Sequence, residues 1–205
     1  GYDRHFAITE YFGIKMINIP MTETGPDMDL VEQYVNNDPA VKGIWCVPKY
    51  SNPQGYTYSQ ETVERFARLK PAAPDFRIYW DNAYSVHHLY DDEKEQDFLL
   101  EILEECAKAG NPDLVYKFTS TSKVSFPGSG IAAVAASKAN LEDFRSYMQI
   151  QTIGHDKLNQ LRHVKFFKNI DGLHEHMRKH AAILRPKFEM VEATLEKELG
   201  GLGIG

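Results

Sequence analysis

The chain has 205 residues, of which 42% are hydrophobic, 25% are charged and 12% are aromatic, and its net charge is −6 at pH 7. This composition is typical of a globular domain, and the acidic balance argues against nucleic acid as the main partner, because phosphate binding needs a basic face. No run approaches the roughly 20 apolar residues that a membrane span needs, so no membrane partner is expected.

Short apolar runs alternate with helical patterns along the first two thirds of the chain. Helices are predicted at residues 27–37, after an N-cap at Ser59, and at residues 97–110, where a glycine ends the pattern. The predicted strands are, in chain order, residues 14–19, 41–47, 76–81, 114–119 and 131–136. Alternating strands and helices predict an α/β fold with three α/β/α layers and a mostly parallel sheet.

From Lys138 onward the pattern is helical. The last helix carries an apolar stripe in which residues recur at intervals of three or four: Leu173, Met177, Ala181, Leu184, Phe188, Val191, Leu195 and Leu199. Pro186 lies inside this stripe and is expected to kink the helix without ending it. We expect residues 1–170 to form a ligand-binding large domain and residues 171–205 a long helix.

The two ends predict that the chain is a fragment. It starts at Gly1 without a methionine, and it stops in the glycine-rich segment 200–205, which resembles a cut connection. We expect the long helix to lead into a missing C-terminal small domain, and the fragment by itself to be inactive.

Polar motifs follow three of the predicted strands. These motifs are Lys-Tyr-Ser-Asn-Pro-Gln-Gly around Asn52, Asp-Asn-Ala-Tyr from Asp81, and Ser-Thr-Ser-Lys ending at Lys123. In open α/β sheets ligands bind outside the carboxyl ends of the strands, so these residues are candidates for one site. Each motif alone also has a plain reading as a turn, a cap or a solvated loop.

In this order the three motifs resemble the signature of fold-type I pyridoxal-phosphate (PLP) aminotransferases: Asn-Pro-x-Gly, Asp-x-Ala-Tyr and Ser-x-Ser-Lys. Asn52 and Asp81 are 29 residues apart, and Asp81 and Lys123 are 42 apart, which is of the family's usual order. The resemblance covers nearly the whole chain as the large domain. The stretch from Ser120 to Gly130 looks most like aspartate aminotransferases of the corynebacterial type.

The resemblance implies a role for each motif residue. Lys123 would bind PLP covalently as a Schiff base and move the substrate's proton. Asp81 would pair with the pyridine nitrogen and keep it protonated. Asn52 and Tyr84 would hydrogen-bond the phenolic oxygen of the ring.

Two residues near the start are further candidates. In the family an aromatic residue stacks on the cofactor ring, and in some members a histidine three positions later supports the aspartate. Tyr2 and His5 have that spacing. Both also read as ordinary residues near a chain terminus.

The phosphate site departs from the family pattern. Most members have an arginine seven or eight residues after the lysine, whereas this chain has Gly130 and Ile131. We therefore expect the hydroxyls of Ser120 and Ser122, together with backbone N–H groups of the glycine-rich loop, to bind the phosphate.

The resemblance implies a transaminase that moves an amino group between an amino acid and a 2-oxo acid, with aspartate and 2-oxoglutarate as the leading pair, and a homodimer when full length. A PLP lyase or decarboxylase is the rival among enzymes. An aminotransferase-like effector domain of a transcription regulator is the rival outside them.

The remaining candidates predict no further chemistry. Cys46 and Cys106 are far apart and lack metal spacing, which fits a reducing cytoplasm. His87 and His88 have no cysteine or carboxylate partner at ligand spacing, so no metal is expected.

Overall fold

The computed structural model describes residues 3–202, and the chain divides into two compact units. The first contains residues 3–84 and 98–156, and the second contains residues 85–97 and 157–202. All strands and every described candidate site residue belong to the first unit.

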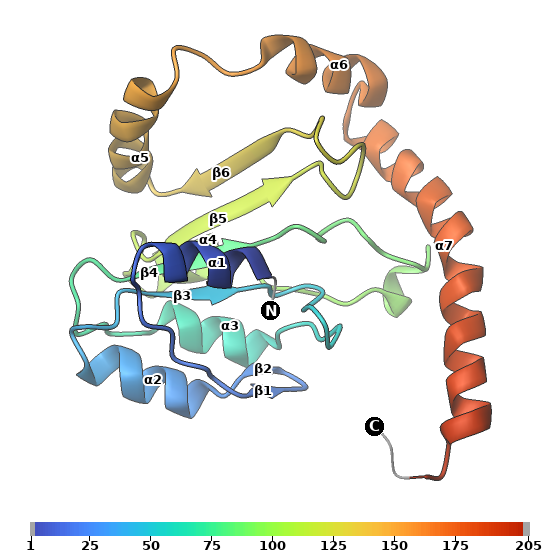
Figure 1. Ribbon diagram of the computed structural model, residues 1–205, viewed down its shortest axis with the longest axis horizontal. Helices are drawn as coiled ribbons and strands as arrows, with labels where there is room; N and C mark the ends of the chain where they lie inside the picture. Colours follow the sequence, from blue (N-terminus) through green and yellow to red (C-terminus); the bar gives the residue numbers. More distant parts are fainter. Residues whose placement is uncertain (1–2, 203–205) are drawn as a thin grey trace. The chain divides into compact units, whose positions relative to one another are not determined.

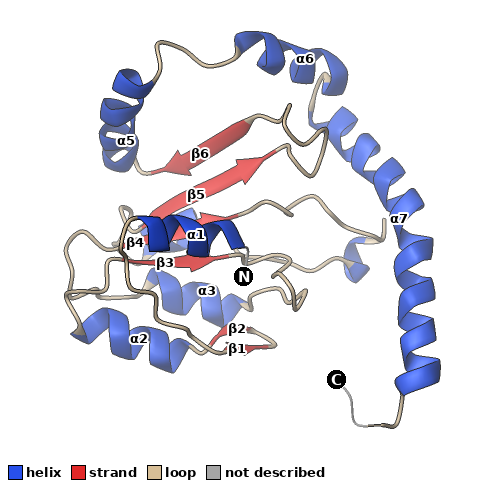
Figure 2. Ribbon diagram, in the orientation of Figure 1, coloured by secondary structure: helices blue, strands red, loops and turns tan. Residues whose placement is uncertain are grey.

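A four-stranded sheet is the centre of the first unit (Figures 1 and 2). Its strands are adjacent in chain order: β3 (Gly43–Cys46), β4 (Arg77–Asp81), β5 (Val115–Ser120) and β6 (Ala132–Ala136). β3, β4 and β5 are parallel, whereas β6 runs antiparallel to β5. The predicted mostly parallel sheet is therefore confirmed, with one antiparallel edge strand.

One face of the sheet forms the hydrophobic core. Because successive side chains of a strand point to opposite faces, Cys46, Ile78, Trp80 and Val115 share a face, and each is at most 1% exposed. Three helices supply the rest of this core: α2 (Met28–Asn37), α3 (Gln60–Ala67) and α4 (Ile102–Lys108).

The opposite face is covered differently. His5 of α1 (Asp3–Tyr11) stacks on Trp45 of β3, and Phe144 of α5 (Lys138–Gln151) contacts Tyr116 of β5. Asn140 of α5 also accepts a hydrogen bond from Arg77 of β4. Helices thus lie on both faces, which confirms the predicted α/β/α layers.

Side-chain caps fix where the core helices begin. The Asp27 carboxylate accepts from the backbone N–H groups of residues 29 and 30, and the Ser59 hydroxyl accepts from the N–H of Thr62. Glu101 caps α4 and also pairs with Lys117 of β5. The predicted helix at 97–110 is therefore shorter than expected, because its cap lies at residue 101.

The strand predicted at residues 14–19 is wrong. This apolar run has no strand partner among the described residues, and Ile14, Met16 and Ile17 are exposed. An apolar run becomes a strand only where a neighbour pairs with its backbone. The pairing that does occur nearby is a short hairpin of β1 (Met21–Thr22) and β2 (Gly25–Pro26).

The second unit consists of helices and of the loop at residues 85–97, which contains the short 3-10 turn η1 (Glu93–Glu95). It contains α6 (Lys157–Phe167) and the 30-residue α7 (Ile170–Leu199), which continues through Pro186 as predicted. Arg185 of α7 lies over the ring of Tyr90 and donates to the carbonyl of Leu89. In the described part of the chain, no helix is both long enough and apolar enough to cross a membrane.

Candidate functional site

The three polar motifs follow the carboxyl ends of three adjacent parallel strands. Asn52 lies in the loop after β3, Asp81 is the last residue of β4, and Lys123 follows β5 by three residues. The Asn82 N–H donates to the carbonyl of Phe118 at 2.8 Å, so the end of β4 is tied to that of β5. Because the three strands are adjacent and parallel, the motifs lie at the same edge of the sheet, as the sequence predicts.

Asp81 is the best-defined group of the site. Its Oδ2 atom lies 3.7 Å from Nε2 of His5, which is too long for a hydrogen bond but close enough for a charge interaction. The backbone of Ala83 and the side chain of Trp45 also act on its carboxylate, and both favour its charged form. Three elements of the first unit therefore converge on this one side chain.

Burial controls the charge of this pair. It raises the pKa of Asp81 above the ordinary value, although His5, Ala83 and Trp45 oppose the rise. Burial also lowers the pKa of His5, and this effect outweighs the attraction of Asp81. Burial thus favours the neutral form of both the carboxyl group and the imidazole.

The loop after β5 is closed by its own hydrogen bonds. The Thr121 hydroxyl accepts from the N–H of Ile131 at 2.9 Å, and the Ser120 hydroxyl accepts from the N–H of Ser122 at 3.4 Å. A Cβ atom at position 130 would lie 3.0 Å from Oγ of Ser122. Gly130 thus lets the returning backbone pass beside Ser122, where a side chain would be in tight contact with the serine.

The other predicted residues lie at the open edge. Lys123 and Asn52 are exposed, and Tyr84 is half-buried. The described residues therefore do not desolvate Lys123. Tyr2, the predicted stacking residue, lies outside the described residues, whereas His5 is buried and lies beside Asp81.

Sequence reasoning missed two residues near these motifs. Trp45 stacks on His5, and its signal in the sequence is an aromatic residue at the paired position of each neighbouring strand, namely Tyr79 and Tyr116. Lys49 is buried despite its charge, with Nζ 5.7 Å from the centre of the Tyr50 ring. A Pro-Lys-Tyr sequence reads as an exposed turn, which is why burial at this position was not expected.

The donor set can hold a ligand that is cationic at one end and anionic at the other. A desolvated carboxylate suits a protonated ring nitrogen, and hydroxyls near a tight glycine-containing loop suit a phosphate. The primary amine of Lys123 suits an aldehyde carbon. These observations fit pyridoxal phosphate without requiring an arginine in the loop after β5.

Known proteins are similar to this chain over its whole length. The family description "Aspartate amino-transferase" matches residues 1–205. The aspartate aminotransferase of Corynebacterium glutamicum is 46% identical over 204 residues, which are 100% of this chain and 46% of that protein. The chain thus spans about half the length of the curated relatives that it matches.

Solved structures agree with the sequence comparison. A crystal structure of an aspartate transaminase from Corynebacterium glutamicum has a TM-score of 0.93 and 45% identity, and covers 100% of this chain and 47% of that one. LysN, the α-aminoadipate aminotransferase of Thermus thermophilus, was solved with N-(5'-phosphopyridoxyl)-L-leucine. It has a TM-score of 0.73 at 23% identity, covering 91% of this chain and 46% of its own, and at that identity it shows the fold alone.

Proposed function

Because the chain belongs to the aspartate aminotransferase family, we propose that the full-length protein is a PLP-dependent transaminase that moves an amino group between an amino acid and a 2-oxo acid. The observation that carries this proposal is the desolvated carboxylate of Asp81 at the edge where the Asn52 and Lys123 motifs also end. A structural carboxylate would gain nothing from such burial without a cation beside it.

PLP supplies an electron sink that takes up charge when a bound amino acid loses its α-proton. Lys123 would bind the cofactor covalently and would then carry the proton between substrate atoms as base and acid. Asp81 would hold a proton on the pyridine nitrogen. Asn52 and Tyr84 would orient the ring through its phenolic oxygen.

Ser120 and Ser122 are the proposed phosphate donors. Hydroxyl donors to a phosphate dianion make charge-assisted hydrogen bonds. The close approach of Gly130 to Ser122 supports this assignment, because a side chain at position 130 would crowd the serine hydroxyl.

We propose aspartate and 2-oxoglutarate as the substrate pair. This choice is supported by the name of the Corynebacterium glutamicum relative, which is 46% identical over the whole of this chain. The residues that would select the substrate's side chain are proposed to lie largely outside these 205 residues.

We propose that the full-length protein is a homodimer and that it is located in the cytoplasm. Cys46 and Cys106 are both buried free thiols, and burial raises the pKa of each to about 12. Such thiols stay protonated and unreactive, which suits a reducing compartment. The homodimer is proposed from the family resemblance.

The test is a transamination assay on the full-length protein with added PLP. Aspartate with 2-oxoglutarate should form glutamate and oxaloacetate. Lys123→Ala should abolish turnover, whereas the matched control Lys138→Ala, at a side chain 90% exposed, should leave it unchanged. Product formed without a 2-oxo acid would favour a lyase or decarboxylase instead. No turnover with any amino acid and 2-oxo acid would contradict the proposal and favour a regulatory effector domain.

A further inference from the structure

The apolar stripe of α7 is covered over one part of its length and bare over the rest. In the first part, Met177 and Ala181 are only 6% and 7% exposed. Phe167 of α6 lies edge-on to the ring of His176, so α6 packs beside this part of the helix. Further along, four residues of the same stripe are between 40% and 52% exposed, namely Leu184, Phe188, Val191 and Leu195. We call these four residues the bare stripe.

The bare stripe is a continuous row of side chains. An α-helix turns about 100° per residue, so residues three and four positions apart lie on the same side of it. Leu184 and Leu195 are eleven residues apart, and α7 is one continuous helix (Figure 1), so the row is about 16 Å long. Single exposed apolar residues are common on protein surfaces, whereas contiguous apolar patches mark sites of interaction.

The helix needs a partner on this side for its own stability. Pro186 has no N–H group, so the carbonyl of residue 182 loses its usual helical partner within the bare stripe. Isolated helical segments shorter than roughly 12–15 residues are marginal in water, and most helical stability in proteins comes from packing of an amphipathic face. Residues 187–199, which follow the proline, form such a segment. The face that would stabilise this segment is the bare stripe.

The length of related proteins indicates what covers the bare stripe. The whole of this chain matches only 46% of the Corynebacterium glutamicum aspartate aminotransferase, so more than half of that relative lies outside the matched residues. A full-length protein of that size has further chain with which to bury an apolar row. A segment of the same chain is held near α7 at a high effective concentration, which favours it over a separate molecule.

We propose that the bare stripe is an internal docking surface, covered in the full-length protein by the part that lies outside residues 1–205. We call that part the outer part. The bare stripe has one aromatic and three aliphatic side chains, so the contact face of the outer part must be apolar, because a polar group there would be buried without a partner. In the full-length protein α7 is then a rigid connection between the second unit and the outer part.

Photo-crosslinking in the full-length protein tests this proposal. The photoreactive residue p-benzoylphenylalanine, in place of Phe188, keeps an aromatic ring in the bare stripe and forms a covalent bond with a C–H group that lies against it. The matched control carries the same residue in place of Lys197, whose side chain is 79% exposed. Lys197 is nine residues after Phe188 and therefore lies on the opposite side of the helix. Circular dichroism establishes that both variants are folded.

The Phe188 variant should give a crosslinked product with the mass of a single chain. Peptide mapping should show that position 188 is linked to a peptide from outside residues 1–205, and the Lys197 variant should give no such product. Three results would overturn the proposal. These are a product of twice the chain mass, which identifies a second copy, a linked peptide from within residues 1–205, or no more crosslinking at position 188 than at position 197.

Hydroxyl-radical footprinting of the unmodified full-length protein decides the case in which the Phe188 variant does not fold. Phe188 should be oxidised much more slowly in the native protein than after unfolding in urea, and this protection should persist on dilution. A native rate close to the unfolded rate, or protection that disappears on dilution, would contradict the proposal. Neither measurement depends on PLP or on transamination, so the docking surface and the proposed function can fail independently.

Discussion

The two faces of the sheet use the same strands for different purposes. On the core face, Cys46, Ile78 and Val115 are at most 1% exposed and pack against three helices. On the opposite face, Asp81, Tyr116 and Ser120 are only partly buried, and the helices there leave the strand ends open. Strand alternation thus lets one face hold the structure together while the other presents polar groups to a ligand. We call these the core face and the site face.

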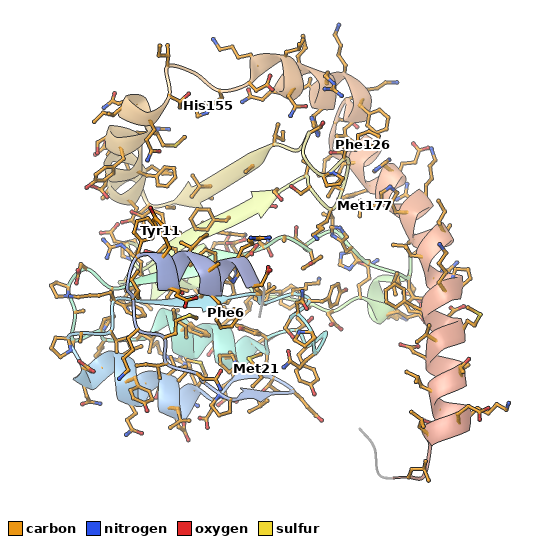
Figure 3. The ribbon with its side chains drawn as sticks, in the orientation of Figure 1. Phe6, Tyr11, Met21, Phe126, His155 and Met177 are labelled. Atoms are coloured by element: carbon orange, nitrogen blue, oxygen red, sulfur yellow. The ribbon has the colours of Figure 1, made fainter. Side chains whose placement is uncertain are left out.

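The exposure of phenylalanine side chains differs between the two faces. Figure 3 shows Phe126 on the loop between β5 and β6 and Phe6 on α1, and both are exposed. Both come from segments that flank the site face. The core-face residue Phe66, by contrast, is fully buried, with its ring parallel to Tyr58 and edge-on to Trp80.

The largest effect on stability is expected on the core face. Phe66→Ala should lower the free energy of unfolding by about 3–5 kcal/mol, because it removes a fully buried ring and leaves a cavity. The matched truncation on the site face, Phe118→Ala, should cost clearly less, since that ring is only partly buried. Denaturant unfolding measures both, and equal losses would break the distinction between the faces.

The largest effect on activity is expected on the site face. Asp81→Ala should lower the transamination rate of the full-length protein roughly 100- to 1000-fold at saturating PLP, because a preorganised charge is lost, while changing stability far less. Asp75→Ala is the control at the other end of β4, where an exposed ion pair with Lys42 contributes little. Parent-like rates for Asp81→Ala would rule out its role.

The serines should show an intermediate effect. Ser120→Ala and Ser122→Ala each remove a proposed donor to the phosphate, worth about 1.5–3 kcal/mol, so PLP affinity should fall roughly ten- to a hundredfold. Ser146→Ala on α5, an exposed serine bonded to a helix carbonyl, serves as the control. PLP titration separates the cases. Unchanged affinity in both variants would mean that the serines only shape the turn and that the phosphate ligand lies elsewhere.

The smallest expected effect is on pH dependence. Because burial lowers the pKa of His5 below 6.5, the unfolded chain takes up a proton before the folded one as the pH falls. Stability should therefore decline as the pH drops below about 6.5. Asp81 has the opposite sign, since its raised pKa lets the folded chain take the proton first, at lower pH. His5→Gln should flatten the decline seen in urea titrations between pH 6.5 and 5, and an unaltered slope would show that His5 is not its source.

The sequence predicted well those features that depend on local chemistry. Ser59 caps a helix where expected, the helix predicted from Asp27 begins at that residue as its cap, and the motifs that start at Asp81 and end at Lys123 lie at the ends of strands as expected. An apolar run followed by a polar motif can be recognised in the sequence without knowledge of any long-range contact. The run at residues 14–19 has the same apolar character but no partner strand, and nothing in the local sequence could reveal that.

Trp45 shows where sequence reading stops. Its contact with Tyr79 depends on the register of β3 against β4, and its stacking on His5 depends on α1 folding back over the sheet. Both are long-range features that a single sequence does not encode in any local pattern. The antiparallel direction of β6 and the burial of Lys49 were missed for the same reason.

The central claim is that Lys123 binds PLP covalently, and the most direct test is borohydride reduction of the full-length holoprotein followed by peptide mapping. The account predicts one pyridoxyl group, on Lys123. Lys49 is the informative rival, because it is a buried lysine close to the Asn52 motif. A pyridoxyl group on Lys49 or on any other lysine, with Lys123 unmodified, would contradict the account.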